Sequence, residues 1–80
     1  MDERKDRLVQ SAAQLYQLGI ALDRARERLR QLAERGVPYS SPEMMAAYRE
    51  FSQLEQQWQE QETAHLRLRD EIVGKPQDAQ

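Results

Sequence analysis

Cysteine is absent from the 80 residues, and glycine and proline occur only three times each. Without thiols the chain can form neither disulfides nor thiolate metal sites, and a single histidine does not make a zinc site. No segment approaches the roughly 20 apolar residues that a membrane span needs. Met1–Arg7 (MDERKDR) does not lead into the apolar core of a secretory signal. We therefore expect no cofactor, no metal, no membrane contact and a cytoplasmic location.

Basic character is also missing, because the net charge is −2 and the pI is about 5.4. This balance argues against a nucleic-acid partner. The chain has no glycine-rich phosphate loop, no paired acid–base carboxylates and no nucleophile motif, so we expect neither an enzyme nor a small-molecule substrate. A chain of this length buries only roughly 60–65% of its unfolded surface, which makes the core of a monomer marginal.

Helix formers fill most of the sequence, and the helix-breaking residues cluster in Gly36–Pro42 (GVPYSSP). Gly36 can adopt the left-handed conformation that ends a helix. Ser41 is predicted to be the N-cap of a second helix and Pro42 its first residue. Glu43 adds a favourable negative charge in the first turn. The cluster therefore predicts a turn between two helices.

We expect helices over about 2–35 and 42–73, each near 50 Å long, joined by a turn over 36–41. The tail 74–80 is expected to fray. Helices of equal length with a short connector form an antiparallel hairpin. The predicted fold is therefore all-α, with residues 1–80 as a single domain.

Both predicted helices carry large apolar residues at seven-residue intervals, with a second set between them. We call these positions the seam, and their spacing predicts left-handed, coiled-coil-like packing. In the first helix the seam comprises Leu8, Ser11, Leu15, Leu18, Leu22, Ala25, Leu29 and Leu32. In the second helix it comprises Met44, Ala47, Phe51, Leu54, Trp58, Gln61, His65, Leu68 and Ile72.

Folding the chain about its turn sets large seam residues against small ones, as close packing requires. Trp58 is expected to face Leu18 and Gly19, and room for the indole would explain a glycine inside a helix. The other expected pairs are Phe51 with Ala25 and Leu22 with Leu54. The net charges favour the same pairing of the two helices, since residues 1–40 have a net charge of +2 and residues 41–80 have a net charge of −4.

A second apolar strip lies on the first helix, about 100° around from the seam. One partner helix cannot cover both surfaces, so the surplus predicts a further contact. The contact is either self-association into a homodimeric bundle or binding of another protein. The candidate partner-binding residues are Val9, Ala13, Tyr16, Ile20 and Tyr48, and Met45 and Leu66 add further apolar surface.

His65 is the only histidine, and the predicted register sets it opposite Ser11 with Gln61 one turn away. A polar layer inside a helical bundle commonly fixes register at some cost in stability. The alternative is a pH-sensitive or ligand-binding layer. No carboxylate is placed to orient the imidazole, so catalysis by this group is not expected.

Two exposed features have alternative interpretations. Arg24, Arg26, Arg28 and Arg30 resemble a basic patch, but alternate residues of a helix lie on different faces and acids are interspersed. We interpret them as a salt-bridged surface, although they could also guide an acidic protein. Val37 and Tyr39 in the turn either pack locally as part of the helix cap or form a recognition loop.

The segments Leu29–Ala33 (LRQLA) and Ser41–Tyr48 (SPEMMAAY), separated by a turn with a proline, resemble the middle of type III secretion needle subunits. The C-terminal arm differs, since Leu66–Ile72 (LRLRDEI) is charged where needle subunits are apolar. The small needle co-chaperones of the same systems are more similar in size, charge and two-arm pattern. That resemblance implies a helical hairpin whose apolar face binds a larger chaperone.

The start of the second helix, Pro42–Glu43, is also similar to that of the sporulation aspartyl-phosphate phosphatases. Their catalytic signature would fall on Tyr48–Ser52, where only Glu50 matches and the aspartate is missing. Phosphatase activity is therefore not expected. The predicted function is a non-enzymatic protein-binding module of co-chaperone or accessory type. The alternative is a homodimeric helical-hairpin regulator or inhibitor, for example one encoded by a mobile element.

Overall fold

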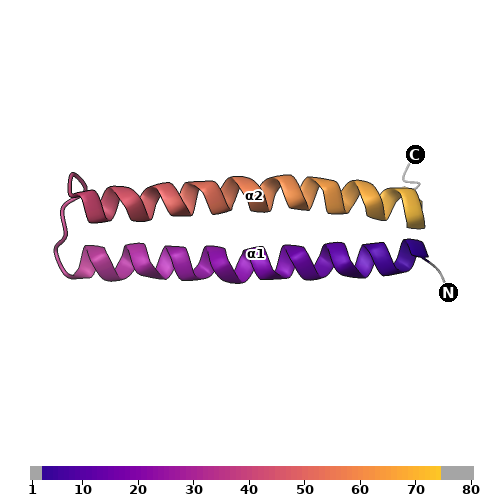
Figure 1. Cartoon of the computed structure of the whole chain (residues 1–80), viewed down its shortest axis with the longest axis horizontal. Coiled ribbons are helices and arrows are strands. Elements are labelled where there is room, and N and C mark those ends of the chain that lie inside the picture. Colours follow the sequence, from indigo (N-terminus) through magenta and orange to yellow (C-terminus); the bar gives the residue numbers. More distant parts are fainter. Residues whose placement is uncertain (1–2, 75–80) are drawn as a thin grey trace, which may run out of the picture.

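The computed structural model describes residues 3–74 and shows two helices that run side by side in opposite directions (Figure 1). Helix α1 spans Glu3–Glu34 and α2 spans Pro42–Val73, and they pack against each other along their length. The predicted all-α helical hairpin is therefore confirmed. The expected start of the first helix at residue 2, and residues 75–80 of the expected frayed tail, lie outside the described residues.

The end of α1 shows why the chain turns where it does. Gly36 has a φ of +79°, a backbone conformation that residues with a Cβ rarely adopt. Its N–H donates to Ala33 O at 3.0 Å, and the Val37 N–H donates to Leu32 O at 3.0 Å. This bonding pattern is the Schellman motif, and Val37 completes it by packing on the cluster that contains Leu32. The local-packing interpretation of Val37 thus fits the observed contact.

The start of α2 is fixed by a side-chain cap. Ser41 has extended backbone angles, and its Oγ accepts a hydrogen bond of 3.1 Å from the Met44 N–H. Pro42 follows in the first turn, where its missing N–H costs nothing. The cap supplies an acceptor for an N–H that has no partner within the helix.

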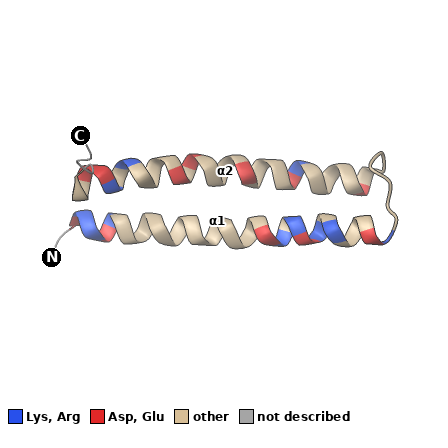
Figure 2. Ribbon diagram, turned by 180° about the vertical axis from the view of Figure 1, so that it is seen from behind, with Lys and Arg blue, Asp and Glu red and all other residues tan. Residues whose placement is uncertain are grey.

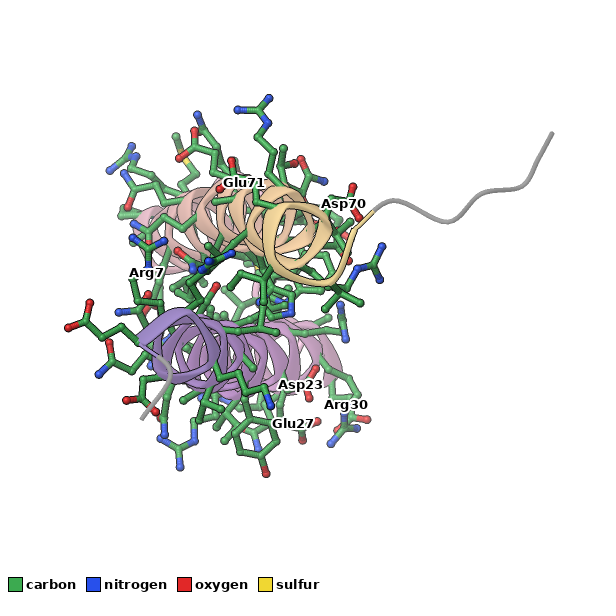
Figure 3. All side chains as sticks on the ribbon, turned by 90° about the vertical axis from the view of Figure 1, so that its right-hand side faces the viewer. Arg7, Asp23, Glu27, Arg30, Asp70 and Glu71 are labelled. Carbon is green, nitrogen blue, oxygen red and sulfur yellow. The ribbon has the colours of Figure 1, made fainter. Side chains whose placement is uncertain are left out.

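All seam residues are buried or half-buried, and side chains fill the space between the helices when the hairpin is viewed along its axis (Figure 3). The buried hydrophobic residues of the described chain gather toward the turn: Ala25, Leu32, Met44 and Ala47. Among the described residues of the open half, where the chain ends lie, the one buried side chain is that of Ser11. The core is therefore tightest beside the turn and shallow toward the open end.

Trp58 lies beside Gly19 as the predicted register requires, but the explanation for the glycine changes. A Cβ built on Gly19 would lie 3.8 Å from Trp58 Nε1, which is an ordinary van der Waals contact. An alanine therefore fits at this position, and the indole does not require a glycine.

Candidate protein-binding face

A groove of about 730 Å³ runs between the helices across the middle of the hairpin. Three seam residues and Gly19 contribute to its lining, which comes from both helices. The residues that line it are Ala12, Leu15, Tyr16, Gly19, Ile20, Leu22, Asp23, Arg26, Glu55, Trp58 and Gln59. The groove therefore identifies which side chains of α1 and α2 share one side of the hairpin.

Residues seven apart on a helix project in nearly the same direction. Tyr16 lines the groove, so Val9 projects on the same side; Glu55 likewise places Tyr48 there. Gln59 lies on this side too, and three of the four positions seven or fourteen residues from it are apolar, the fourth being Ser52. We call the resulting surface the apolar flank; it comprises Val9, Tyr16, Met45, Tyr48, Leu66 and Val73.

The apolar flank holds six of the seven exposed large hydrophobic side chains of the described residues. Val9 is 68% exposed and Tyr16 is 69% exposed. The seventh, Tyr39, lies in the turn with its ring centroid 5.7 Å from that of Tyr48. The neighbouring Tyr39 phenol also raises the pKa of Tyr48. The exposed apolar side chains thus lie on one side of the molecule, in one group toward the open end and another at the tip, with Asp23, Arg26 and Glu55 between them.

The opposite side of the hairpin is polar. A smaller hollow of about 460 Å³ marks it, lined by Ala21, Arg24, Ala25, Arg28, Glu50 and Leu54. Seven-residue steps from Ala21, Arg28 and Glu50 give a basic edge on α1 and an acidic edge on α2. This polar flank comprises Arg7, Gln14, Ala21, Arg28, Glu43, Glu50, Gln57, Ala64 and Glu71. None of the exposed large hydrophobics described above lies on it.

The predicted partner-binding residues do not all have the same role. Val9 and Tyr16 belong to the apolar flank, and Ala13 is exposed between them on α1. Ile20 is half-buried and forms part of the groove wall. Tyr48 lies on the same side but nearer the turn, against Tyr39. The structure therefore brings Tyr16 and Ile20 together at the groove and separates them from Tyr48 along the axis.

Sequence reasoning assigned Trp58 to the seam alone and did not include Gly19, Met45, Leu66 or Val73 among the partner-binding residues. Trp58 and Gly19 also line the groove. The signal for the others was present, because Met45, Gln59, Leu66 and Val73 are separated by multiples of seven. Recognising them as one surface required knowing which flank of α2 faces the same side as Tyr16.

The polar layer predicted within the seam is present. His65 Nδ1 lies 3.0 Å from Ser11 Oγ, and Gln61 Nε2 donates to the same oxygen at 3.4 Å. Ser11 is buried, and no buried side-chain nitrogen or oxygen of the described residues lacks a partner. Among these residues, no group of three or more His, Cys, Asp or Glu side chains is arranged to hold a metal ion.

The arginines of α1 are partly neutralised by neighbouring acids on the same helix. Arg30 pairs with Glu27 and Glu34, and Arg26 Nη1 lies 3.2 Å from Asp23 Oδ1. The hydrogen bond from Arg30 lowers the pKa of Glu27, and Glu27 in turn raises the pKa of Arg30. Arg26 also stacks over Phe51, with 5.8 Å between its Cζ and the ring centroid. These contacts fit the interpretation as a salt-bridged surface.

Arg24 and Arg28, the other two arginines of the expected patch, make no ion pair within the described part of the chain. In the end-on view, the labelled Asp23, Glu27 and Arg30 lie together on one side of α1 (Figure 3). Between the charged N-terminus of α1 and this cluster, residues 8–22 carry no charge, as Figure 2 shows. That uncharged stretch includes the α1 side of the apolar flank.

Comparison with protein-family models, with curated proteins and with solved structures gives no match for this chain. Neither α1 nor α2 is apolar enough over a sufficient length to cross a membrane. The function therefore has to be inferred from the side chains of the hairpin.

Proposed function

We propose that this chain is a non-enzymatic protein-binding module that docks its apolar flank and groove onto a helical protein surface. The observation that carries the proposal is the asymmetry of the hairpin: six exposed large hydrophobics lie on one flank. The single histidine is engaged with Ser11 in the seam and does not line the groove. Exposed apolar side chains gathered on one side of a small protein are typical of protein-interaction sites.

The docking mode that fits this surface is helix against groove. Tyr16 and Ile20 of α1 and Trp58 of α2 line the groove, so a helix laid along it would insert apolar side chains between them. Aromatic residues of this kind often dominate binding energy. The charged side chains at the end of the groove, Asp23, Arg26 and Glu55, would select the partner and its orientation.

The more specific form of the proposal is a co-chaperone or accessory factor of the type III secretion kind, acting in the cytoplasm. The residues that support it are those of the resemblance, Leu29–Ala33 and Ser41–Tyr48. Such a protein would use its apolar flank to hold a larger helical chaperone. A regulator or inhibitor that works as a homodimer is the second candidate, favoured by the opposite net charges of the two helices.

A photo-crosslinking amino acid tests the role of the flank. We expect a benzophenone side chain at position 16 to give one defined protein adduct in the producing cell, identified by mass spectrometry. The same group at Gln17, an exposed neighbour that points away from the groove, should give none. The adduct should also disappear when Ile20→Ser is added. Equal labelling from both positions, or no adduct from either, would refute protein binding through this flank.

A further inference from the structure

The open half of the hairpin lacks the cover that the turn half has. The buried hydrophobic residues lie at Ala25 or nearer the turn. In the open half, the seam leucines of α1 are half-buried, and Val9 and Tyr16 are exposed beside them. The groove spans the middle of the hairpin and reaches into this half at Ala12, Leu15 and Tyr16. The open half therefore has the least buried core, and it also exposes the apolar side chains Val9 and Tyr16.

The two helices carry charges of opposite sign. On the side of the apolar flank, seven-residue steps from Tyr16 and Gly19 on α1 reach the described charged residues Lys5, Asp23, Arg26 and Arg30, which have a net charge of +2. On the same side of α2, seven-residue steps from Glu55 and Gln59 reach the charged residues Glu55, Glu62 and Arg69, which have a net charge of −1. A helix that lies against α1 is therefore favoured electrostatically if it resembles α2, and a helix against α2 is favoured if it resembles α1.

We infer that the apolar flank is covered by the same flank of a second copy of this chain, in an antiparallel four-helix bundle with α1 of each copy beside α2 of the other. This inference rests on the proposed function and names the occupant of the face. A two-fold axis parallel to the hairpin gives this arrangement and sets both turns at the same end. A two-fold axis across the hairpin would instead stack α1 on α1 and α2 on α2, which opposes like net charges.

The register within one hairpin predicts what meets across the bundle. Ser11 lies opposite His65, and Gly19 lies beside Trp58. Val9 and Leu66 are therefore at nearly the same height along the axis. Under the parallel two-fold axis equal heights face each other, so Val9 of each copy approaches Leu66 of the other. Both side chains are exposed in the single hairpin and would be covered in the bundle.

The flank is large enough for a stable dimer. Each helix has 32 residues and is about 48 Å long at about 1.5 Å per residue. Two adjacent helices present a face about 20 Å wide, since each is about 10 Å across. The face therefore measures about 950 Å² per copy, and a standard stable interface buries about 800 Å² per partner.

Light scattering coupled to size-exclusion chromatography of the purified full chain tests whether a second copy covers the apolar flank. We expect the mass of two chains, and a melting temperature that rises with protein concentration. Tyr16→Ser with Ile20→Ser should give the mass of one chain. The matched control, Gln14→Ser with Gln17→Ser, changes two exposed residues of the same helix outside the groove and should remain dimeric.

The arrangement is tested by spin labels, which are easily placed because the chain has no cysteine. Ser40→Cys puts one label in each turn, where Ser40 is exposed. Turns at the same end should give a distance below about 30 Å, whereas opposite ends would give at least the hairpin length of about 48 Å.

A wild-type chain that stays monomeric at high concentration overturns the inference without help from any variant. A dimer that persists in Tyr16→Ser with Ile20→Ser, with helicity intact by circular dichroism, also overturns it, as does the longer label distance. Failure of the proposed function is separate, because a monomer whose position 16 crosslinks to a different protein would retain protein binding and lose only the second copy.

Discussion

At the residue scale, Ser11 is the buried polar side chain on which two others converge. Its Oγ contacts His65 Nδ1 at 3.0 Å and accepts from Gln61 Nε2 at 3.4 Å. Such a layer favours one register over its neighbours, because a shift by one heptad would separate the three groups. Leucine at these positions would gain burial but lose that discrimination.

We predict that Ser11→Ala lowers the free energy of unfolding by about 1 kcal/mol, because it leaves His65 and Gln61 without their shared partner. Adding His65→Leu and Gln61→Leu should recover most of the loss, since an apolar layer leaves no group unpaired. Urea denaturation of the single and triple variants measures both changes. A single variant as stable as the wild type would mean that the layer contributes nothing.

Gly19 is the residue whose helical position has no explanation within one hairpin. We predict that Gly19→Ala raises the free energy of unfolding by about 0.5–1 kcal/mol, because alanine is the better helix former and its Cβ would meet Trp58 Nε1 at an ordinary 3.8 Å. Thermal melting at low protein concentration checks this. A lower melting temperature would indicate a close approach at Gly19 by something other than Trp58.

At the element scale, the boundaries of the helices depend on local bonds that can be removed singly. We predict that Ser41→Ala destabilises the hairpin by about 1 kcal/mol, because the Met44 N–H loses its acceptor. Ser40→Ala is the control, since Ser40 is exposed and lies just outside the cap. Both variants are compared by urea denaturation. Equal effects of the two substitutions would argue against the cap.

The acidic and basic side chains of α1 predict a small pH dependence. Arg30 lowers the pKa of Glu27 from its ordinary value of 4.5, so ionised Glu27 stabilises the folded state. That contribution is complete above pH 4.5 and is lost as the pH falls through the lowered pKa. The group is exposed, so salt should weaken the effect.

We therefore expect Glu27→Gln to melt below the wild type at neutral pH and to converge with it at strongly acidic pH. Melting curves of both proteins across this range, at low salt, measure the difference. A gap that persists unchanged in strong acid would assign the effect of the substitution to something other than the Glu27 charge.

At the scale of the whole molecule, stability is distributed unevenly along the axis. Buried hydrophobic residues lie near the turn, and the open half relies on half-buried leucines and the polar layer. Helices shorter than about 12–15 residues are marginal without tertiary contacts. Each open half-helix is close to this length, so it depends on what covers it.

We predict that hydrogen exchange is faster in the open half than beside the turn in the monomeric variant Tyr16→Ser with Ile20→Ser. In the wild type at high concentration, the second copy should slow exchange in residues 8–22 in particular. Mass spectrometry of peptides from each half measures both patterns. Uniform protection in the monomer would contradict the uneven core.

The fold was predictable because its signals are local. Gly36 and Ser41 set the helix ends through their own backbone and side-chain bonds, and the seven-residue spacing identifies the seam before any contact is known. The polar layer followed from the same register, since Ser11 and His65 occupy seam positions. Whether Trp58 requires a glycine at position 19 could not be predicted in this way. The answer depends on the distance between the indole nitrogen and the position that a Cβ on Gly19 would occupy.

By itself, the sequence determined two helices, a turn and a surplus of apolar side chains, since helix propensity, capping and periodicity act within a few residues. Only the tertiary structure decided that the surplus lies on one side of the hairpin. Val9 and Tyr16 belong to α1 while Tyr48 and Leu66 belong to α2, and nothing within either helix relates the two sets. The two sets lie on one side of the hairpin because the antiparallel packing of α1 on α2 brings the corresponding sides of the two helices next to each other. Periodicity along a single helix does not specify which sides these are.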